Sequence, residues 1–296
     1  NNPEKDEYNH WENFVDRSAE VAREANVNFE TLSAAEVRAK SPKILITDDE
    51  HAGFEPTGGH VMIEKAIAVQ LDLARQLGAK TLLESPVIDI QSDESGVVVS
   101  TAEGNYLGAK AIVSTGAWIN DFMPERLEQN FRVTRQIVFW FEVDDPEEYG
   151  PEQLPGILWV GRRLEDYFAA FTLPPGSKPG LKVLTEQYVD ATSPQAVTRD
   201  ISQDEIDDFY QKFGETKIAG LNKNCLKASV CLYTHTPDDH FVIDYHPTLH
   251  NVMIVSACSS HGFKHSAAIG ESLVQQLFEG ESKISLAPFA LARLER

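Results

Sequence analysis

Several features that often assign a protein to a class are missing from this chain of 296 residues. It has three cysteines (Cys225, Cys231 and Cys258) and no Cys-x-x-Cys pair, which argues against a disulfide framework and against a structural zinc site. No run of about 18 apolar residues occurs, so we expect no transmembrane helix. The polar first residues contain no signal-peptide core, and we therefore expect a cytoplasmic protein.

Positive charge is also scarce. There are 26 Lys and Arg residues against 46 Asp and Glu residues, a formal net charge of -20. Such a chain repels nucleic acid and anionic membranes, so we expect neither as a partner, although an acidic surface also serves simply to keep a protein in solution. With 42% hydrophobic residues the chain can bury a large core, and its length suggests about two domains of roughly 150 residues each.

The chain contains no Gly-x-Gly-x-x-Gly sequence, the turn that binds the pyrophosphate of a dinucleotide. The βαβ unit of about 30 residues that carries this turn is lacking as well. The chain begins with Asn1 rather than Met, and we expect it to be a truncated protein.

Local patterns predict five helices. The stretch 4–26 has a thin apolar stripe, and capping boxes at Ser33–Glu36 and Ser202–Glu205 each open a helix. A firmer helix is expected over 61–77, where five apolar residues fall on one face and Gly78 follows as a C-terminal cap. The fifth helix follows the His261 turn, runs through Phe278 and is capped by Gly280.

Strands are expected in a parallel sheet and in an antiparallel sheet. The predicted strands are 81–83, 86–90, 97–99, 109–113, 135–143, 157–160, 182–189 and 252–255. The apolar run 111–113 leads into Ser-Thr-Gly-Ala-Trp, which suits a parallel sheet whose carboxyl edge faces a ligand. The middle strands lack intervening helices, which implies an antiparallel sheet. The predicted class is therefore α/β, or α+β overall.

The residues from Ser259 onward could carry chemistry. A helix start has unsatisfied N–H groups and partial positive charge, so it stabilises an anion. Gly262 would let the backbone approach a ligand closely, and Lys264 adds a full positive charge. An ordinary strand–loop–helix corner with a surface lysine explains the same residues.

Cys231 is open to more than one interpretation. A cysteine is more often a small buried hydrophobe than a reactive thiol. Reactivity requires a lowered pKa, which His261 and Lys264 could supply if the fold brings them close. A Cys231–His261 hydrolase pair is less favoured because no nucleophile elbow is present. The six histidines of the last third match no zinc-finger pattern, and we expect no metal. Asp238 and Asp239 sit in a Pro-Asp turn, where capping of backbone groups is the simpler role.

The segment from Cys231 to Asp244 reads Cys-Leu-Tyr-Thr-His-Thr-Pro-Asp-Asp-His-Phe-Val-Ile-Asp, and His261-Gly-Phe-Lys follows. Together these residues resemble the monomeric sarcosine oxidase and N-methyltryptophan oxidase family of FAD-dependent amine oxidases. Stretches at 54–59, 114–118, 135–136, 180–182 and 286–289 extend the resemblance over essentially the whole chain.

The resemblance implies a role for each matching residue. Cys231 would tether FAD through a thioether to the 8-methyl carbon, and Lys182 would activate dioxygen near flavin N5. Lys264 would bind the substrate carboxylate. Further cofactor and substrate contacts are implied for His261, Tyr233, Val87, Gly262 and Phe263.

Two departures from the family are expected to matter. Glu186 stands where the sarcosine branch has a histidine, which favours a cationic or polyhydroxylated amine substrate and leaves simple sarcosine in doubt. The missing glycine-rich unit implies that FAD binds weakly or not at all to this chain alone.

The implied fold is a partial glutathione-reductase-like FAD domain (61–128 and 237–296) interleaved with an antiparallel-sheet substrate domain (1–60 and 129–236). The implied activity is oxidation of a secondary amine of an N-substituted amino acid, with O₂ as acceptor and an imine and H₂O₂ as products. The alternative is a non-catalytic remnant that acts as a cofactor-free binding or assembly module.

Overall fold

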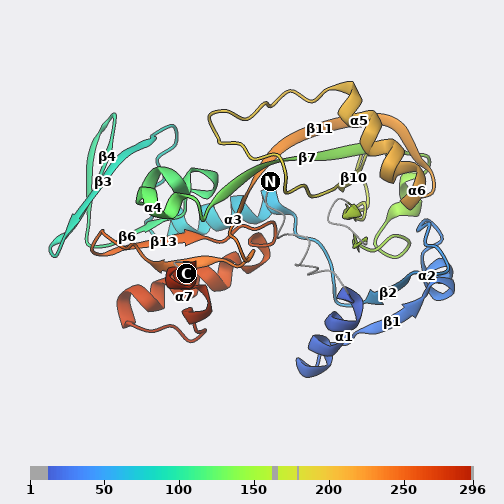
Figure 1. The fold of residues 1–296 in the computed structure, drawn as a ribbon, viewed down its shortest axis with the longest axis horizontal. Helices are drawn as coiled ribbons and strands as arrows, with labels where there is room; N and C mark the ends of the chain where they lie inside the picture. The colour runs from blue at the N-terminus through green and yellow to red at the C-terminus, as the bar shows by residue number, and fades with distance from the viewer. Residues whose placement is uncertain (1–12, 162–165, 179, 295–296) are drawn as a thin grey trace. The chain divides into compact units, whose positions relative to one another are not determined.

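The computed structural model describes residues 13–161, 166–178 and 180–294, which form two compact units (Figure 1). The first unit contains the chain up to His60 together with Gln136–Tyr188 and Thr198–Cys231. The second contains Val61–Arg135, Val189–Val197 and the chain from Leu232 onward. Two of the unit boundaries, after Arg135 and after Cys231, lie within a few residues of the domain boundaries expected from the sequence, which fall after residues 128 and 236.

Each unit combines helices with strands. The first unit holds α1 (Phe14–Glu24), β1 (Glu30–Ser33), α2 (Ala34–Lys40), β2 (His51–Phe54), β8 (Ile157–Trp159), β9 (Phe168–Ala170), β10 (Gly180–Leu184), α5 (Gln203–Phe209) and α6 (Glu215–Lys217). The second holds α3 (Ile63–Gln76), β3 (Val87–Asp93), β4 (Gly96–Thr101), β5 (Gly104–Gly108), β6 (Ala111–Val113), α4 (Glu125–Glu128), β12 (Val242–Tyr245), β13 (Val252–Ser256) and α7 (Ser266–Glu279). Two long strands, β7 (Arg132–Val143) and β11 (Leu221–His235), contribute to both.

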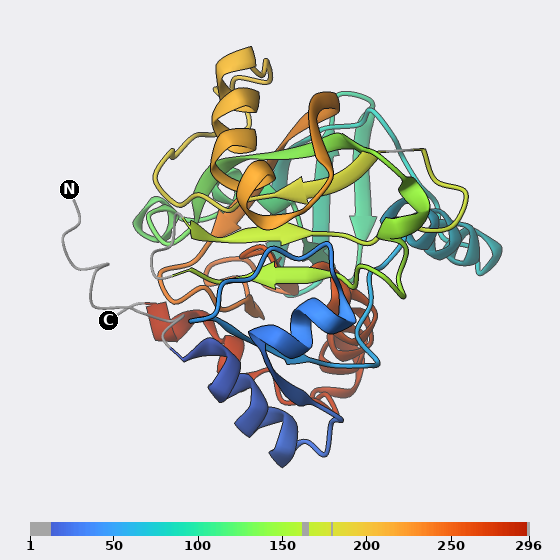
Figure 2. The same ribbon diagram turned by 90° about the vertical axis from the view of Figure 1, so that its right-hand side faces the viewer.

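A five-stranded sheet with the order β11-β7-β10-β9-β8 forms the centre of the first unit. The β7–β10, β10–β9 and β9–β8 pairs are antiparallel, which confirms the prediction for the middle of the chain. Side chains of a strand alternate between the two faces of a sheet, so Phe139 and Phe141 of β7 lie on the same face. Both pack against Phe209 of α5, whose ring centroid lies 4.5 Å from that of Phe139 and 5.8 Å from that of Phe141. Figure 2 shows α5 lying over the sheet.

Both predicted capping boxes are confirmed. Ser33 begins α2 and Ser202 begins α5, and in each case the side chain of the glutamate three residues later accepts a hydrogen bond from the backbone N–H of that serine. The antiparallel β1–β2 pair beside α2 was not predicted from the sequence. The start of the expected helix 4–26 lies outside the described residues, and α1 occupies the rest of it.

A three-stranded sheet with the order β12-β13-β6 forms the core of the second unit. β13 runs parallel to β6 and antiparallel to β12, so a parallel pair ends in the segment 114–118 as expected. Met253 and Val255 pack with Leu273 and Leu277 of α7 on one face. Ile254 packs with Ile119 and other apolar residues on the opposite face.

The antiparallel meander β3-β4-β5 completes the second unit. The predicted strand at Thr81–Leu83 is wrong, because these residues pair with no strand in the described parts of the chain. Helix α3 is present as predicted, but none of its side chains is buried. Among the described residues, no helix combines the length and the apolar character needed to cross a membrane.

Candidate functional site

Two hydroxyl groups at the carboxyl ends of β13 and β6 form the centre of the candidate site in the second unit. Ile254 pairs with Val113; Ser256 is the last residue of β13, and Thr115 lies two residues beyond the end of β6. Ser256 is 4% exposed, and neither its Oγ nor the Oγ1 of Thr115 has a hydrogen-bond partner among the described residues. Buried hydroxyls are normally satisfied, and ligands bind at the carboxyl edge of parallel strands. The two hydroxyls are therefore candidates for contact with a ligand at this edge of the sheet.

The loop after β13 is bent tightly. Ser259 and Ser260 have φ values of 39° and 68°, in the left-handed region that side chains other than glycine rarely adopt. A methyl group added to Gly262 would overlap the carbonyl oxygen of Ala257, so only glycine fits there. Glycine is thus required at residue 262 by the fold of the loop itself, and the predicted approach of a ligand to Gly262 stays a prediction.

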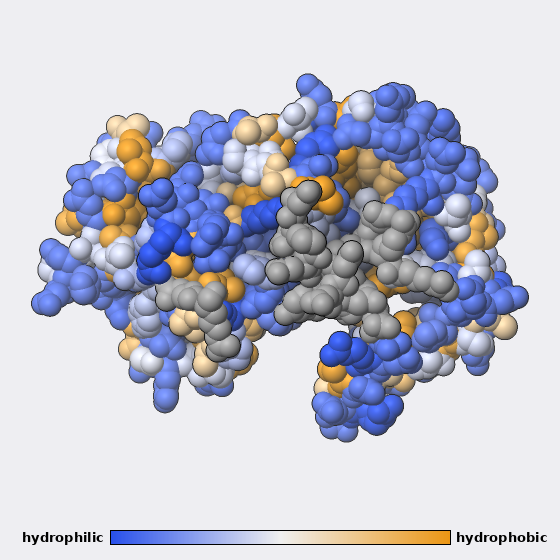
Figure 3. Space-filling model, in the orientation of Figure 1, coloured by the Kyte–Doolittle hydropathy of each residue, from blue (hydrophilic) through white to orange (hydrophobic). Residues whose placement is uncertain are grey.

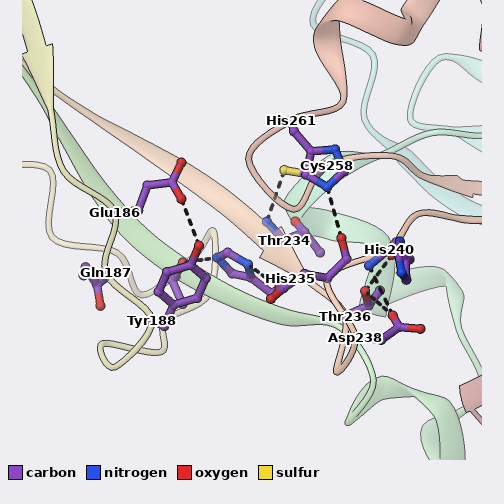
Figure 4. Close-up of polar contacts among 12 residues, drawn as sticks. Glu186, Gln187, Tyr188, Thr234, His235, Thr236, Asp238, His240, Cys258 and His261 are labelled. Carbon is purple, nitrogen blue, oxygen red and sulfur yellow. Dashed lines mark hydrogen bonds and ion pairs between the residues drawn. The ribbon is translucent and has the colours of Figure 1, made fainter. Parts of the chain in front are cut away.

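Two hydrogen bonds tie this loop to the end of β11, and Figure 4 shows the one between Thr234 and Cys258. The Thr234 N–H donates to Cys258 Sγ at 3.3 Å, and the Ser259 N–H donates to the Thr234 carbonyl oxygen at 3.0 Å. Thr234 itself is 1% exposed. The loop is therefore held rigidly against the strand that continues from Cys231.

His261 is held in one orientation. Its Nε2–H donates to the carbonyl oxygen of Asp239 at 3.1 Å, and its ring lies 4.7 Å from that of Phe241. Burial lowers the pKa of His261, and the positive charges of Lys264 and His265 lower it further. The neutral ring therefore carries its proton on Nε2 and presents Nδ1 as an acceptor.

Asp239 also orients a second histidine. His235 is 4% exposed, and its Nδ1 lies 3.2 Å from Asp239 Oδ1 while its Nε2 lies 3.0 Å from Thr134 Oγ1. The ring of Tyr233 meets that of His235 edge-on at 5.9 Å. The sequence did not reveal that Asp239 orients both histidines. Its φ of 55° lies in the left-handed region, which shows that the backbone is constrained at this residue.

Asp238 caps the turn as expected. Its Oδ1 accepts hydrogen bonds from the Thr236 hydroxyl and the His240 N–H, and its carboxylate forms an ion pair with Arg293 at 2.8 Å. Burial raises the pKa of Asp238, but the hydrogen bonds from Arg293 and His240 outweigh it and hold the pKa below its ordinary value. The turn that positions Asp239 is thus fixed by the hydrogen bonds of Asp238 within the turn and by its ion pair with Arg293.

Lys264 lies where α7 begins. The short 3₁₀ turn Phe263–His265 leads directly into the helix, and the side chain of Lys264 is exposed. The helix start adds its partial positive charge to that of the lysine. An anionic group, such as a carboxylate, is favoured at this position.

In the first unit, Lys182 of β10 lies on the face of the sheet opposite Phe139 and Phe141. Its Nζ is 4.6 Å from the ring centroid of Phe171 and 5.9 Å from that of Trp140. The aromatic rings stabilise the ammonium group without neutralising it. Lys182 is therefore a half-buried cation in an aromatic environment.

Glu186 lies just beyond β10 and is 6% exposed. Its carboxylate accepts a hydrogen bond from the Tyr188 hydroxyl at 2.9 Å (Figure 4). Burial raises the pKa of Tyr167, and the negative charge of Glu186 contributes to this shift. Glu186 thus belongs to a polar cluster on the same unit as Lys182.

None of the three cysteines forms a disulfide. Cys231 is half-buried in β11 and is the last residue of the first unit, whereas Cys258 and Lys264 belong to the second. Val87 is the first residue of β3, in the second unit. The structure thus brings His261, Gly262, Phe263, Lys264 and Tyr233 into one unit with Val87, and Lys182, Glu186 and Cys231 into the other.

The second unit also has a hollow of about 310 Å³ lined by residues such as Asn120, Arg132 and Thr192. It contains none of the predicted site residues. We assign no role to it.

A family model described as FAD-dependent oxidoreductase matches residues 3–276, so the chain belongs to this family. Monomeric sarcosine oxidase from Arthrobacter sp. (strain TE1826) is 31% identical over 282 residues, covering 95% of this chain and 72% of the relative. N-methyl-L-tryptophan oxidase from Escherichia coli (strain K12) is 28% identical over 285 residues, covering 95% and 74%. The chain is therefore a flavin-dependent oxidoreductase of the sarcosine oxidase and N-methyltryptophan oxidase type, and these relatives give no support to the alternative of a cofactor-free module.

Solved structures show the same fold. The amino acid oxidase NikD in its open form superposes with a TM-score of 0.75 at 17% identity, covering 93% of this chain and 72% of that one. Amadoriase I from Aspergillus fumigatus superposes with a TM-score of 0.70 at 20% identity, and the match covers 90% of this chain and 63% of that one. The predicted fold class is confirmed.

The described residues fit a flavin. FAD has an anionic pyrophosphate and a ring with many hydrogen-bonding atoms, which the unpartnered hydroxyls of Ser256 and Thr115 and the start of α7 suit. The loop at Gly262 adds backbone that a ring can approach closely.

Proposed function

We propose that this protein oxidises a secondary amine of an N-substituted amino acid, with dioxygen as the electron acceptor. The observation that carries the proposal is the pair of buried, unpartnered hydroxyls of Ser256 and Thr115 beside the Gly262 loop and the start of α7. The names of its sarcosine oxidase and N-methyltryptophan oxidase relatives support the substrate class.

FAD, when bound, supplies a two-electron acceptor for the hydride that leaves the carbon next to the amine nitrogen. Ser256, Thr115 and the backbone at Gly262 and Phe263 would hold it in the second unit, the domain that we assign to the flavin. Val87 would contact its adenine end. Cys231 would attach it covalently: its thiolate sulfur would bond to the 8-methyl carbon in place of one hydrogen, and the two electrons and two protons released would pass to dioxygen, giving hydrogen peroxide.

Lys264 would bind the substrate carboxylate. Its ammonium group stands at the start of α7, where the helix contributes further positive charge. A carboxylate fixed there places the amine at a set distance from the flavin, which is the orientation that the reaction needs. Tyr233, on the strand that continues from Cys231, would line the amine end.

His261 would act on the flavin side as a fixed dipole. Because Nε2–H is committed to the Asp239 carbonyl, Nδ1 accepts rather than donates a hydrogen bond. Asp239 is a positioning residue, since its carbonyl oxygen orients His261 and its carboxylate orients His235.

Lys182 would accelerate the reaction with dioxygen. Reduction of O₂ passes through a negatively charged species, and a fixed cation in an aromatic environment lowers the barrier to forming it. The amine loses two electrons and two protons to become an imine, and water hydrolyses the imine. Dioxygen gains two electrons and two protons to become hydrogen peroxide.

Glu186 would select the substrate. A buried carboxylate beside Tyr188 disfavours an apolar amine substituent and favours a cationic or polyhydroxylated one. Simple sarcosine is therefore expected to be a poor substrate.

The test is to incubate the purified chain with FAD, remove the excess and record the visible absorption of oxidised flavin. The loaded protein is then mixed without oxygen with sarcosine, N-methyl-L-tryptophan or a fructosyl amino acid. We expect bleaching on mixing, and peroxide in a peroxidase-coupled assay once air is admitted. A protein that stays colourless after incubation with FAD, or a loaded protein that no secondary amine bleaches, would overturn the proposal.

A further inference from the structure

Two buried polar side chains meet where β11 ends in the second unit. Hydrophilic residues cover most of the face shown in Figure 3, so a polar side chain is informative chiefly where it is buried. His235, the last residue of β11, and Thr134, on the neighbouring strand β7, are both buried. They belong to the same unit as Asp239 and His261.

Both ring nitrogens of His235 have a partner. Nδ1 lies 3.2 Å from Asp239 Oδ1, and Nε2 lies 3.0 Å from Thr134 Oγ1. A carboxylate only accepts hydrogen bonds, so Nδ1–H donates to Asp239, and Nε2 of a neutral ring accepts a hydrogen bond from the Thr134 hydroxyl. A charged ring would donate from both nitrogens, and the hydroxyl oxygen would accept. Both contacts therefore persist in either protonation state of His235.

Asp239, His235 and Thr134 follow one another in the order of an Asp-His-Thr catalytic triad, in which the hydroxyl group would be the nucleophile. Thr134 is 0% exposed, however, so its hydroxyl cannot meet a substrate. The three residues are therefore suited to fixing a position rather than to reacting with a ligand.

Thr134 and His235 form the rigid end of this chain of contacts. Both stand on neighbouring strands, whereas Asp239 lies in the turn after β11 and its side chain is 37% exposed. The left-handed backbone of Asp239 is a conformation that persists only where surrounding contacts hold it. The bond between His235 and Asp239 thus constrains the turn as well as the ring.

The backbone of Asp239 passes this constraint on to His261. The Asp239 N–H donates to the Thr236 carbonyl oxygen at 3.1 Å, and the Asp239 carbonyl oxygen accepts the Nε2–H of His261 at 3.1 Å. The direction of that carbonyl group depends on the backbone dihedrals of Asp239, which the contact with His235 limits. A displaced carbonyl would leave Nε2 without its partner and would let the proton of the neutral ring move to Nδ1.

His235 also contacts the ring of Tyr233, edge-on at 5.9 Å. Tyr233 is the residue proposed to line the amine end, and His261 is the residue proposed to act on the flavin side. One buried histidine is therefore linked to both ends of the proposed reaction centre.

We propose that His235, anchored by Thr134, is a positioning residue for His261. It holds the Asp239 turn so that His261 keeps its proton on Nε2 and presents Nδ1 as an acceptor. The importance of this arrangement for amine oxidation rests on the proposed function, whereas its effect on the tautomer of His261 does not.

The test uses ¹⁵N-labelled chain without FAD at about pH 8, where the histidine ring is neutral. A two-dimensional NMR spectrum of the rings reports which nitrogen carries the proton, and the His261 signals are identified by their loss from His261→Gln protein. We expect two well-separated signals, from a protonated Nε2 and an unprotonated Nδ1. His235→Leu should move them toward each other. His235→Asn, of nearly equal volume, should not, because its amide N–H stands near the position of Nδ1 and donates to Asp239.

A second pair of variants tests the anchor and keeps the proposal testable if the His235→Leu protein does not fold. Thr134→Val should move the His261 signals in the same direction, and Thr134→Ser should leave them in place. The valine should have no effect in a His235→Asn background, since asparagine has no atom equivalent to Nε2. The matched control is Thr172→Val in the first unit, which removes a buried hydroxyl bonded to the Tyr149 carbonyl oxygen and should not move the His261 signals.

In FAD-loaded protein, His235→Leu should slow reduction by the amine by about tenfold to a hundredfold, and His235→Asn should restore most of the rate. His261 signals that stay apart in both the His235→Leu and Thr134→Val proteins would overturn the proposal and leave the contacts of Asp238 as the cause. Equal displacement by His235→Leu and His235→Asn, or an unchanged rate of reduction in the Leu variant, would overturn it as well. Because the spectra are recorded without FAD, a loaded chain that no amine reduces would count against the oxidase activity alone.

Discussion

Gln136 and Gln187 exchange two hydrogen bonds. The side-chain Nε2–H of Gln136 donates to the Gln187 carbonyl oxygen at 2.6 Å, and the Gln187 N–H donates to Gln136 Oε1 at 3.0 Å. Gln136 is 2% exposed, so these bonds are shielded from water. They fix the irregular backbone that carries Glu186 and Tyr188.

Replacement of Gln136 by Leu should destabilise the protein by about 1–3 kcal/mol, because the Gln187 backbone groups lose their partner. Urea unfolding measures the effect. Gln211→Leu, at an exposed position, is the control and should change the free energy of unfolding by less than about 0.5 kcal/mol. Equal effects of the two substitutions would contradict the structural role of the pair.

Ser202→Ala should cost about 1 kcal/mol of stability, because the serine satisfies the Glu205 N–H at the start of α5. Ser202→Asn should retain most of it, since asparagine is as good an N-cap residue. Thermal unfolding of the three proteins checks the order. A stability of the Asn variant no higher than that of the Ala variant would show that capping is not the cause.

Lys182→Met should slow the reaction of the reduced protein with O₂ by about 10²–10³-fold, since a fixed charge at the developing anion is lost. Its reduction by amine should be nearly unchanged. Lys227→Met is a matched control, because Lys227 also lies over Trp140, with its Nζ 4.4 Å from the ring centroid. Stopped-flow spectroscopy separates the two half-reactions, and normal oxygen reactivity of the Lys182→Met variant would rule out the assigned role.

Cys231→Ala should release the flavin into the supernatant after acid precipitation of FAD-loaded protein, whereas Cys225→Ala and Cys258→Ala should leave it with the pellet. Only Cys231 is assigned as the tether. Cys225 is unsuited to the role because burial raises the pKa of its thiol. Release from the Cys258→Ala protein alone would move the tether to the second unit.

His261 should make stability depend on pH. Its pKa is lowered in the folded protein, so the unfolded chain binds the proton more readily. Stability is therefore complete above the unfolded value of about 6.5 and falls as the pH drops below it, until the folded pKa is passed. His261→Gln should flatten the change in thermal midpoint between about pH 7 and 5. A pH profile identical to that of the unmodified protein would exclude His261 as its source.

Local features of this fold could be predicted from the sequence. The capping boxes at Ser33 and Ser202 and the glycine after α7 depend on neighbouring residues alone, and the structure contains all three. The strand proposed at Thr81–Leu83 has the right residue types but no pairing partner in the described parts of the chain, which local sequence does not reveal. For the same reason, the helical pattern of α3 correctly indicated a helix but not its exposure.

The candidate site was predictable only in part. The Cys231 and His261 motifs identified the family, and Gly262 was singled out for close backbone approach. The structure shows what lies around them, including the unpartnered Ser256 and Thr115 hydroxyls and the double role of Asp239. These depend on which strands become neighbours, and serine and threonine residues in strands carry no distinguishing pattern.

Because β7 and β11 each pass from one unit to the other, neither unit corresponds to a continuous stretch of the chain. During synthesis the described residues of the first unit are all present only when Cys231 has left the ribosome, and those of the second only after α7 has followed. A nascent chain therefore exposes the edge of β6 until β13 has been synthesised, and an edge of β7 until β11 has been synthesised.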